Sequence, residues 1–309
     1  MDRIICVVGP TASGKTKLAV QLAKAYDGEV VSCDSMQIYK HMDIGTAKPT
    51  PEEMEGVPHH MIDCVEPGED FSVGKYVQLA DGCVQDILSR GKTAVIAGGT
   101  GLYVDSLIAG RTFAPVPQTG KREALEAQLR QEGGEAMLRK LRAVDPDAAA
   151  RLHPADEKRI IRALEVYAET GRTITQHNLD TQQTPPRYRP VWIGLDYLDR
   201  AVLYRRIDLR VDLMLQAGLL DEIRALLARG VSPRTTAMQA IGYKEFFDAL
   251  EGRSTLSAAA DLCKQRSRNY AKRQLTWFRH MDGVTWLDAG AADVRQTALR
   301  LTQDFLLKG

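Results

Sequence analysis

The sequence predicts an α/β fold: a parallel sheet flanked by helices, with a helical segment inserted into the chain. Two short apolar runs, residues 4–8 and 93–97, lack alternation and are typical of strands buried on both faces of a parallel sheet. Stretches with apolar residues at helical spacing lie between such runs. Residues 115–188 show helical spacing only, which predicts that the sheet is interrupted there.

The N-terminal third alternates strands with helices. The helix after the first strand, for example, is predicted by the spacing of Leu18, Leu22 and Ala25. The expected elements are, in order, a strand at 4–8, a helix at 15–26, a strand at 29–34, a helix at 73–89, a strand at 93–97 and a helix after Gly101. This alternation indicates a doubly wound sheet.

Two Pro-rich stretches, "FAPVPQTG" (113–120) and "QQTPPRYRP" (182–190), border the predicted insertion. Between them, apolar residues recur at helical spacing: Leu125, Leu129, Leu138, Leu141, Ile160, Ile161, Leu164 and Val166. We therefore predict an α/β core made of residues 1–114 and 189–309, and a helical insertion made of residues 115–188.

The C-terminal part returns to the sheet. "VWIGLDY" (191–197) predicts a further strand. The elements expected after it are helical stretches at 199–229, 236–250 and 257–280, a strand at 284–287 and a final helix.

The composition excludes several classes of protein. The 309 residues include 41 Lys and Arg against 40 Asp and Glu, so the whole chain has no strong field to attract nucleic acid. The five cysteines form no C-x-x-C pair, which favours reduced thiols and no zinc cluster. No apolar stretch approaches the roughly 18 residues of a membrane span, and the N-terminus leads into a strand. We expect a cytoplasmic protein without membrane contact.

A local basic surface is expected near the C-terminus, because residues 264–280 contain six Lys or Arg and no acid. On a helix, one face would hold Lys264, Arg268, Lys272 and Arg279, and the other would hold Arg266 and Arg273 among Tyr270 and Trp277. The first face fits either a solvated surface or a binding surface. Arginines on an apolar face require a partner, for which a diphosphate is a candidate.

The loop between the first strand and helix is the strongest functional signal. Its sequence, "GPTASGKT", fits G-x-x-x-x-G-K-[ST] and comprises Gly9, Pro10, Thr11, Ala12, Ser13, Gly14, Lys15 and Thr16. Glycines let backbone amides converge on anionic oxygens, and the helix N-terminus adds positive potential. Lys15 supplies a charge, and the hydroxyl of Thr16 can bind Mg²⁺. The pattern predicts a P-loop NTPase-like sheet and phosphate binding, but not the rest of the ligand.

Two polar residues should lie near this loop. A kinase or NTPase with this loop would show an apolar strand ending in an acid, whereas the strand at 93–97 ends in glycines and Thr100. Asp34 follows the second strand instead. Strand carboxyl ends meet at one edge of a parallel sheet, so Asp34, Thr100 and the loop should converge. Asp34 could also cap a turn, and Thr100 a helix.

With these residues in place, the chain resembles the tRNA dimethylallyltransferases, also called tRNA isopentenyltransferases. The motifs that carry the resemblance are, in order, "GPTASGKT", "VVSCDSMQIYKHMDIGTAKP", "HHMID", "GGTGLYVDSLI", "KRIIRALEVY", "RVDLMLQAGLLDEI", "QAIGYKEF" and "YAKRQLTWFR". They span nearly the whole chain. Eukaryotic relatives carry an added C-terminal zinc finger, and the chain has no Cys/His cluster after its last motif, so the bacterial type is expected.

The resemblance implies transfer of a dimethylallyl group from dimethylallyl diphosphate to the exocyclic amine of the adenosine 3′ of the anticodon. Mg²⁺ is the implied cofactor, with Thr16 as its ligand, and the loop would hold the prenyl diphosphate. Asp34 matches the family's base and Thr100 a residue that contacts the substrates. Arg210 matches a second cation at the leaving group, beside Lys15, and Arg273 is a further candidate. Without the resemblance, a surface salt bridge would fit Arg210 equally well.

The resemblance also implies a set of tRNA contacts in the anticodon loop. The acceptor base must leave its stack to be reached, which predicts a channel entered by RNA on one face and by the diphosphate on the other. The implied contacts are Asp34, Ser35, Met36, Gln37, Thr100, Arg122, Lys158, Arg159, Ile160, Ile161, Arg162, Gln239, Gly242, Tyr243 and Lys244. The insertion would thus bind tRNA. For Arg162, which can share a helix face with Lys158 and Arg159, a solvated face fits the pattern as well.

Three other functions stay open on the sequence. An adenylate isopentenyltransferase would share the loop and donor but modify free nucleotides, and the basic "KRIIR" of the insertion favours RNA instead. A P-loop kinase would consume ATP without prenyl transfer. An RNA-binding module would tolerate loss of Lys15. A monomer is expected.

Overall fold

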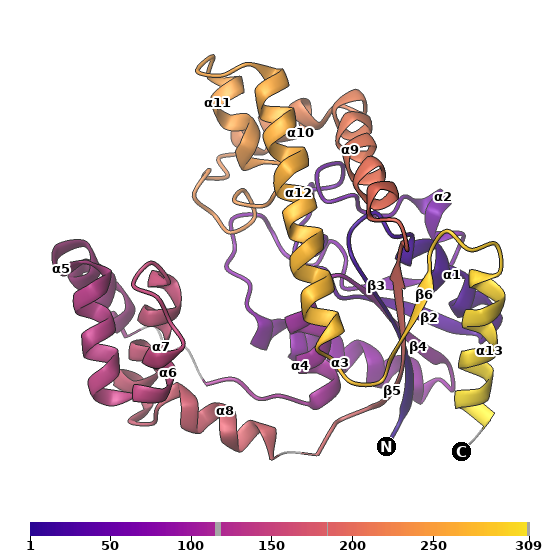
Figure 1. The fold of residues 1–309 in the computed structure, drawn as a ribbon, viewed down its shortest axis with the longest axis horizontal. Coiled ribbons are helices and arrows are strands. Elements are labelled where there is room, and N and C mark those ends of the chain that lie inside the picture. The colour runs from indigo at the N-terminus through magenta and orange to yellow at the C-terminus, as the bar shows by residue number, and fades with distance from the viewer. Residues whose placement is uncertain (115–118, 184, 308–309) are drawn as a thin grey trace. The chain divides into compact units, whose positions relative to one another are not determined.

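The computed structural model describes residues 1–114, 119–183 and 185–307, and their contacts form two units (Figure 1). Unit 1 comprises Met1–Ile108 and Arg187–Gly309, and unit 2 comprises Ala109–Pro186. These borders lie slightly earlier in the chain than the predicted ones. The Pro-rich borders are described only in part, because residues 115–118 and 184 lie outside the described residues.

Unit 1 contains a six-stranded sheet of parallel pairs in the order β3-β2-β4-β1-β5-β6. The strands are β1 (Arg3–Val8), β2 (Gly28–Ser32), β3 (His59–His60), β4 (Thr93–Gly98), β5 (Arg189–Asp196) and β6 (Val284–Asp288). The predicted α/β class is confirmed. Because β1 lies between β4 and β5, the loop after β1 leaves the sheet near its middle, where open α/β sheets bind ligands.

Helices cover both faces of this sheet (Figure 1). The helices of unit 1 are α1 (Lys15–Ala25), α2 (Pro51–Met54), α3 (Val73–Ser89), α4 (Gly101–Ala109), α9 (Arg200–Gln216), α10 (Leu219–Ala228), the 3₁₀ helix η1 (Lys244–Phe246), α11 (Phe247–Leu250), α12 (Leu256–Arg279) and α13 (Val294–Leu307). Among the described residues, none of the helices is both long and apolar enough to span a bilayer.

Alternate residues of β1 enter two separate cores, because successive strand side chains point to opposite faces. Ile5 and Val7 pack with residues of α1 and α13. Ile4 and Cys6 pack on the other side with residues of α3 and α4 and with Phe278 of α12. Burial on both faces explains the unbroken apolar run that predicted this strand.

A further core joins α9, α10, η1 and α12 to the loop that follows β2. Ile38 and Met42 of this loop are fully buried in it. The carboxylate of Glu222 in α10 accepts hydrogen bonds from the backbone amides of Asp43, Ile44 and Gly45 at 2.7 to 3.0 Å. The segment after β2 is therefore fixed by α10.

Two predicted elements differ from the structure, and one strand was missed. The helix predicted at 199–229 is two helices, because Gly218 adopts a φ of 98° and ends the first. The helix predicted at 236–250 is wrong: turns precede η1 and α11, and Gly242 has a φ of 100°. Strand β3 was not predicted, since its two residues are both histidine and neither is buried.

Unit 2 is helical in its described residues. Its helices are α5 (Lys121–Val144), α6 (Pro146–Ala150), α7 (Glu157–Thr170) and α8 (Ile174–Gln182). Leu141 of α5 and Ile160 of α7 are fully buried in its core. Gly133 has a φ of 77°, which kinks α5.

The chain leaves and re-enters unit 1 at a single hydrogen-bonded point. The carbonyl of Ile108 accepts the amides of Arg187 at 2.9 Å and of Tyr188 at 3.3 Å. Arg187 also forms an ion pair with Asp81 of α3 at 3.0 Å. The two ends of the insertion are thus joined within unit 1 itself.

A charged cluster stabilises the edge of the sheet that carries β3. The side chain of Glu29 in β2 is 4% exposed. Its carboxylate accepts from Arg90 at 2.5 and 2.9 Å and from His60 at 2.8 Å, and lies 3.3 Å from the amine of Lys92. The hydrogen bonds from Arg90 are the main cause that holds the pKa of Glu29 well below its usual range.

We expect Glu29→Gln to lower the free energy of unfolding at pH 7 by about 1–2 kcal/mol, because the cations lose a buried ionised acceptor. A carboxyl with a depressed pKa stabilises the fold above its ordinary value of 4.5, and this contribution fades as the pH falls below it. Urea unfolding of both proteins should therefore show a difference at pH 7 that narrows below pH 4.5. The exposed Glu55, paired with Lys24, gives the control Glu55→Gln. A pH-independent difference would contradict the expectation.

Candidate active site

The glycine loop between β1 and α1 forms a tight turn. Gly9 has a φ of 144°, and a Cβ there would lie 2.3 Å from the carbonyl oxygen of Leu195 in β5. Gly14, with a left-handed φ of 90°, caps the N-terminus of α1. The first amides of α1 are thereby presented to one point, an arrangement that suits an anion.

Side chains of the loop add to these amides, and the loop (residues 9–16) and the first amides of α1 together are called the cradle. Ser13 is 2% exposed, and its Oγ has no hydrogen-bond partner among the described residues. A buried hydroxyl without a partner is costly, which points to an oxygen of a ligand. The amine of Lys15 donates to the carbonyl of Pro10 at 2.6 Å. Thr16, in the first turn of α1, is partly buried.

Two arginines of α9 reach the same loop. Arg210 Nη1 donates to Thr11 Oγ1 at 3.2 Å, and Arg206 Nε donates to the carbonyl of Ala12 at 3.0 Å. The structure thus brings Arg210 to the loop, as the resemblance implied. Arg206 was missed, although its position four residues before Arg210 on a helix could have indicated it.

The cations of the cradle affect one another. Burial, and then the charge of Arg210, lower the pKa of Lys15 to about 8, while the charge of Asp34 acts in the opposite direction. Burial, and then Arg206, lower the pKa of Arg210. Cations held together at this cost are typical of a site for a polyanion.

Asp34 and Thr100 follow the neighbouring strands β2 and β4. Asp34 Oδ1 accepts from the amides of Met36 at 2.8 Å and Gln37 at 3.3 Å, so the turn-capping role is real. Thr100 Oγ1 accepts from the amide of Ser35 at 3.1 Å, and its own amide donates to the carbonyl of Cys33 at 3.1 Å. The two residues are therefore joined through the turn at Asp34. Because β2 and β4 lie beside β1 in one parallel sheet, this turn and the glycine loop lie at the same edge of the sheet.

Tyr270 of α12 lies against the same turn. The side chain of Thr100 lies beside the Tyr270 hydroxyl, and burial, followed by the charge of Asp34, raises the pKa of Tyr270 to about 12. The guanidinium of Arg273 stacks on the Tyr270 ring, 5.6 Å from its centroid. Arg273 is exposed, and its predicted contact with the diphosphate stays a prediction.

The residues after Asp34 are half-buried. Gln37 is held by its amide, which accepts from Ser32 Oγ at 3.2 Å and donates to the carbonyl of Ala47 at 3.0 Å. Ser35 and Met36 remain partly accessible. Their predicted contacts with the acceptor base stay predictions.

The motif at 239–246 offers less to RNA than predicted. Tyr243 is fully buried, and its hydroxyl donates to Glu222 at 2.6 Å. Gly242 is also buried, and its amide donates to Glu245 at 2.9 Å. A Tyr243 side chain cannot contact RNA in this state, so only Gln239, which is exposed, and Lys244, which is partly exposed, keep accessible side chains.

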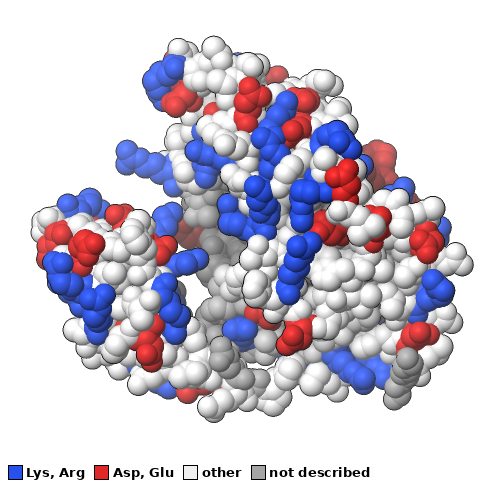
Figure 2. All heavy atoms as spheres, viewed as in Figure 1, with Lys and Arg blue, Asp and Glu red and all other residues white. Residues whose placement is uncertain are grey.

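Three of the four cations on the basic face of α12 are paired with acids of the protein. Figure 2 shows Lys and Arg side chains in a row over α12 with acids beside them. The ion pairs are Lys264 with Asp212 at 2.6 Å, Arg268 with Asp208 at 2.5 Å and Arg279 with Asp196 at 3.0 Å. Arg266, for which a diphosphate was a candidate partner, pairs with Glu245 of η1 at 2.8 Å. The partner that an arginine on this face requires is therefore supplied by a buried acid of the protein itself.

In unit 2, the residues of the basic motif on α7 differ in exposure. Lys158 and Arg159 are exposed, whereas Ile160 and Ile161 are buried in the core and cannot offer side chains to RNA. Arg162 donates to Glu165 at 2.9 Å and to the carbonyl of Ala114 at 3.0 Å. Arg122 shares Glu165 at 3.3 Å. Arg162 and Arg122 thus already serve the structure of unit 2.

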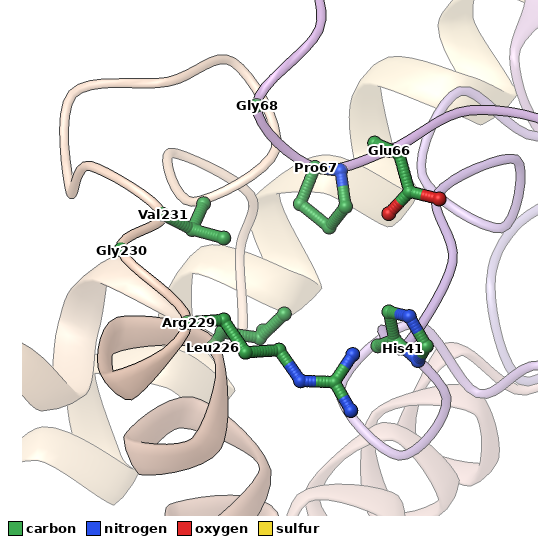
Figure 3. Close-up of a pocket in the computed structure, with 8 residues that line it drawn as sticks. All are labelled: His41, Glu66, Pro67, Gly68, Leu226, Arg229, Gly230 and Val231. Carbon is green, nitrogen blue, oxygen red and sulfur yellow. The ribbon is translucent and has the colours of Figure 1, made fainter.

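The described residues contain no group of three His, Cys, Asp or Glu that could hold a metal ion. The cradle fits a divalent ion held by hydroxyl groups such as that of Thr16 and by phosphate oxygens of a ligand, the usual manner of Mg²⁺. A cavity of about 250 Å³ lies elsewhere, between His41, Glu66 and Arg229 (Figure 3). It contains none of the predicted site residues.

Two family models match the chain. One is described as IPP transferase and matches residues 37–281, and the other as Isopentenyl transferase and matches residues 2–65. A tRNA dimethylallyltransferase of Acetivibrio thermocellus is 44% identical over 307 residues, which cover 99% of this chain and 98% of that protein. One of Bacillus subtilis is 48% identical over 286 residues, with 92% and 90% covered.

Solved structures agree with these similarities. The full-length tRNA isopentenylpyrophosphate transferase of Bacillus halodurans has a TM-score of 0.74 and 44% identity, covering 99% of this chain and 96% of that one. A eukaryotic dimethylallyltransferase acting on tRNA has a TM-score of 0.86 and 31% identity, covering 100% of this chain and 80% of that one.

Proposed function

The chain belongs to the IPP transferase family, and from this premise we propose that it transfers a dimethylallyl group from dimethylallyl diphosphate to N6 of the adenosine 3′-adjacent to the anticodon in tRNA. Pyrophosphate is released. Its similar proteins include bacterial tRNA dimethylallyltransferases. One observation carries the assignment of chemistry to residues: the glycine loop, Thr100 and Asp34 follow the carboxyl ends of three neighbouring parallel strands, β1, β4 and β2. The leaving-group cradle and the candidate base therefore lie at one edge of the sheet.

The cradle acts on the leaving group. The C–O bond between the allylic carbon and the diphosphate breaks, and the oxygen departs with the electron pair. Lys15, Arg210 and the amides at the start of α1 lie where they would neutralise this charge. When bound, Mg²⁺ would supply further neutralisation, with the Thr16 hydroxyl as its protein ligand.

Asp34 acts on the acceptor. The N6 amine forms the new bond to the allylic carbon, and its proton passes to the Asp34 carboxylate. The hydrogen bonds to Met36 and Gln37 use Oδ1, which fixes the direction of Oδ2. Thr100 and Tyr270 border the turn at Asp34 and orient the acceptor side.

The direct test supplies labelled dimethylallyl diphosphate with Mg²⁺ to the purified protein, together with total tRNA, AMP or ATP in separate reactions. We expect label in tRNA, and mass analysis should place a five-carbon addition on one adenosine per molecule. Replacement of that adenosine by guanosine in a transcript is the matched control. Label in AMP alone, or ATP cleavage without prenyl transfer, would refute the proposal.

Unit 2 supplies the proposed contacts with tRNA through Lys158 and Arg159, both exposed. We expect Lys158→Gln with Arg159→Gln to weaken tRNA binding and to reduce the slope of log K against log salt concentration by roughly 0.7–1 for each phosphate that the variant no longer neutralises. Affinity for the diphosphate should not change. Filter binding at several salt concentrations measures the first effect, and titration calorimetry the second.

The control removes two exposed charges from α5 of the same unit, as Arg139→Gln with Arg142→Gln. Arg162 is unsuitable as a test position, because its loss would leave Glu165, 1% exposed, with fewer partners. Equal losses of tRNA affinity in test and control variants would contradict the assignment to Lys158 and Arg159.

A further inference from the structure

One buried amide on α12 joins two parts of the site. Gln274 is 5% exposed. Its Oε1 accepts from the amide of Thr11 at 2.8 Å, and its Nε2 donates to the carbonyl of Gly99 at 2.9 Å. Thr11 belongs to the phosphate-binding loop, and Gly99 directly precedes Thr100. A single side chain thus spans segments that follow β1 and β4.

The chemistry of the two partners fixes the orientation of the amide. A backbone N–H can only donate and a carbonyl can only accept, so the side chain between them must accept from one and donate to the other, as the amide of Gln274 does. Asparagine is shorter by one methylene. Without Gln274, both backbone groups would lose a buried partner.

Glycines allow α12 to approach this closely. A Cβ on Gly99 would lie 2.0 Å from Nε2 of Gln274. Three residues further along α12, Trp277 packs on Gly101, where a Cβ would lie 2.2 Å from the indole ring. The turn that carries Thr100 is therefore held on both sides by consecutive turns of one helix.

We propose that Gln274 is a positioning residue that sets the distance between the leaving-group cradle and the acceptor-side turn. This inference rests on the proposed function. Thr11 carries the contact with Arg210, and Thr100 carries the contacts with Ser35 and Tyr270. Transfer requires the allylic carbon and the amine to be aligned, and a misplacement of about 1 Å can lower a rate by about 10²-fold. Each substrate still binds to its own half of the site when the bridge is absent.

The first test is Gln274→Met, which keeps the length of the side chain and removes both hydrogen bonds. We expect kcat to fall by about 10²-fold while KM for dimethylallyl diphosphate and for tRNA changes by less than about threefold. Thermal melts define a temperature at which both proteins are fully folded. Gln265→Met, at an exposed glutamine on the same helix, is the control and should match the original protein.

The second test is Gln274→Glu, read as a pH profile. A protonated carboxyl can donate to Gly99 and accept from Thr11, whereas an ionised one cannot donate. The ratio of the variant's kcat to that of the original protein should rise as the pH falls from 8 to 5.5. Taking the ratio at each pH cancels titrations that the two proteins share.

The outcomes separate the two levels of inference. An original protein that does not prenylate tRNA overturns both the function and the role of Gln274. If the original protein is active, the role of Gln274 alone is overturned by either of two results. In the first, Gln274→Met keeps the original kcat; in the second, it loses activity only through higher KM values for both substrates. If Gln274→Met does not fold, the Gln274→Glu ratio decides: a rise at low pH supports the role, and a flat ratio overturns it.

Discussion

Replacement of Asp34 by asparagine is expected to slow prenyl transfer by about 10²- to 10⁴-fold, the usual effect of a positioned base. Asparagine keeps an oxygen that can accept from the amides of Met36 and Gln37, so the turn should survive. Alanine would remove both the base and the cap, and its effect would be harder to interpret. Affinities for tRNA and diphosphate should change little.

Single-turnover rates with both substrates saturating measure this effect directly. Asp199 offers a close control, because it caps α9 through Oδ1 with a 2.8 Å bond from the amide of Ala201. Asp199→Asn makes the same chemical change at a similar turn and should leave the rate near its original value. An Asp34→Asn protein as fast as that control would show that another group takes the proton.

The second large effect is expected at Lys15. Lys15→Met should lower kcat by about 10²- to 10³-fold, as loss of one charged donor at a developing anion does elsewhere. Lys17→Met, at an exposed lysine on the same helix, is the control. A normal rate for Lys15→Met would remove Lys15 from the leaving-group cradle.

Lys15 also predicts a pH dependence of diphosphate binding. The pKa of its amine is lowered to about 8 from 10.5, so the amine is mostly neutral at pH 9 in the free protein. A bound polyanion favours the charged amine, and binding at a pH between about 8 and 10.5 therefore takes up a proton. Affinity should fall as the pH rises above 8. Calorimetry at pH 9 in buffers of different ionisation enthalpy counts the protons, and Lys15→Met should abolish the uptake.

The regular parts of unit 1 could be predicted because burial leaves a clear pattern in the sequence. β1 and β4 are unbroken apolar runs because both faces of the sheet are covered. β3 could not be found, since its two residues pair with β2 without forming a run. The segment at 236–250 has apolar residues at helical spacing, but they are buried by turns that pack against α10 and the loop after β2. Tertiary packing overrode the periodicity there.

In the candidate site, the glycine loop could be predicted from its pattern and Arg210 from the family resemblance. The side-chain contacts that join separate segments could not be predicted. The pattern from Gly9 to Thr16 specifies a local backbone conformation, so it can be recognised in a single sequence. Gln274 contacts backbone atoms of two remote segments, and such contacts leave no spacing in the chain, whereas the helical spacing of Arg206 from Arg210 was available but not used. The pairing of Arg266 with Glu245 could not be predicted, because η1 brings Glu245 to it only through the fold.

The hydrogen bonds between Ile108 and Arg187 close the point at which unit 2 is inserted into unit 1. Since unit 1 completes its own hydrogen bonds there, unit 2 can vary in evolution as an independent insertion. The length or sequence of unit 2 can change, or the unit can be replaced, without a change in the unit 1 residues that are proposed to form the carbon–nitrogen bond. Under the proposed role of unit 2 in tRNA binding, the choice of tRNA and the chemistry of the transfer can therefore be inherited separately.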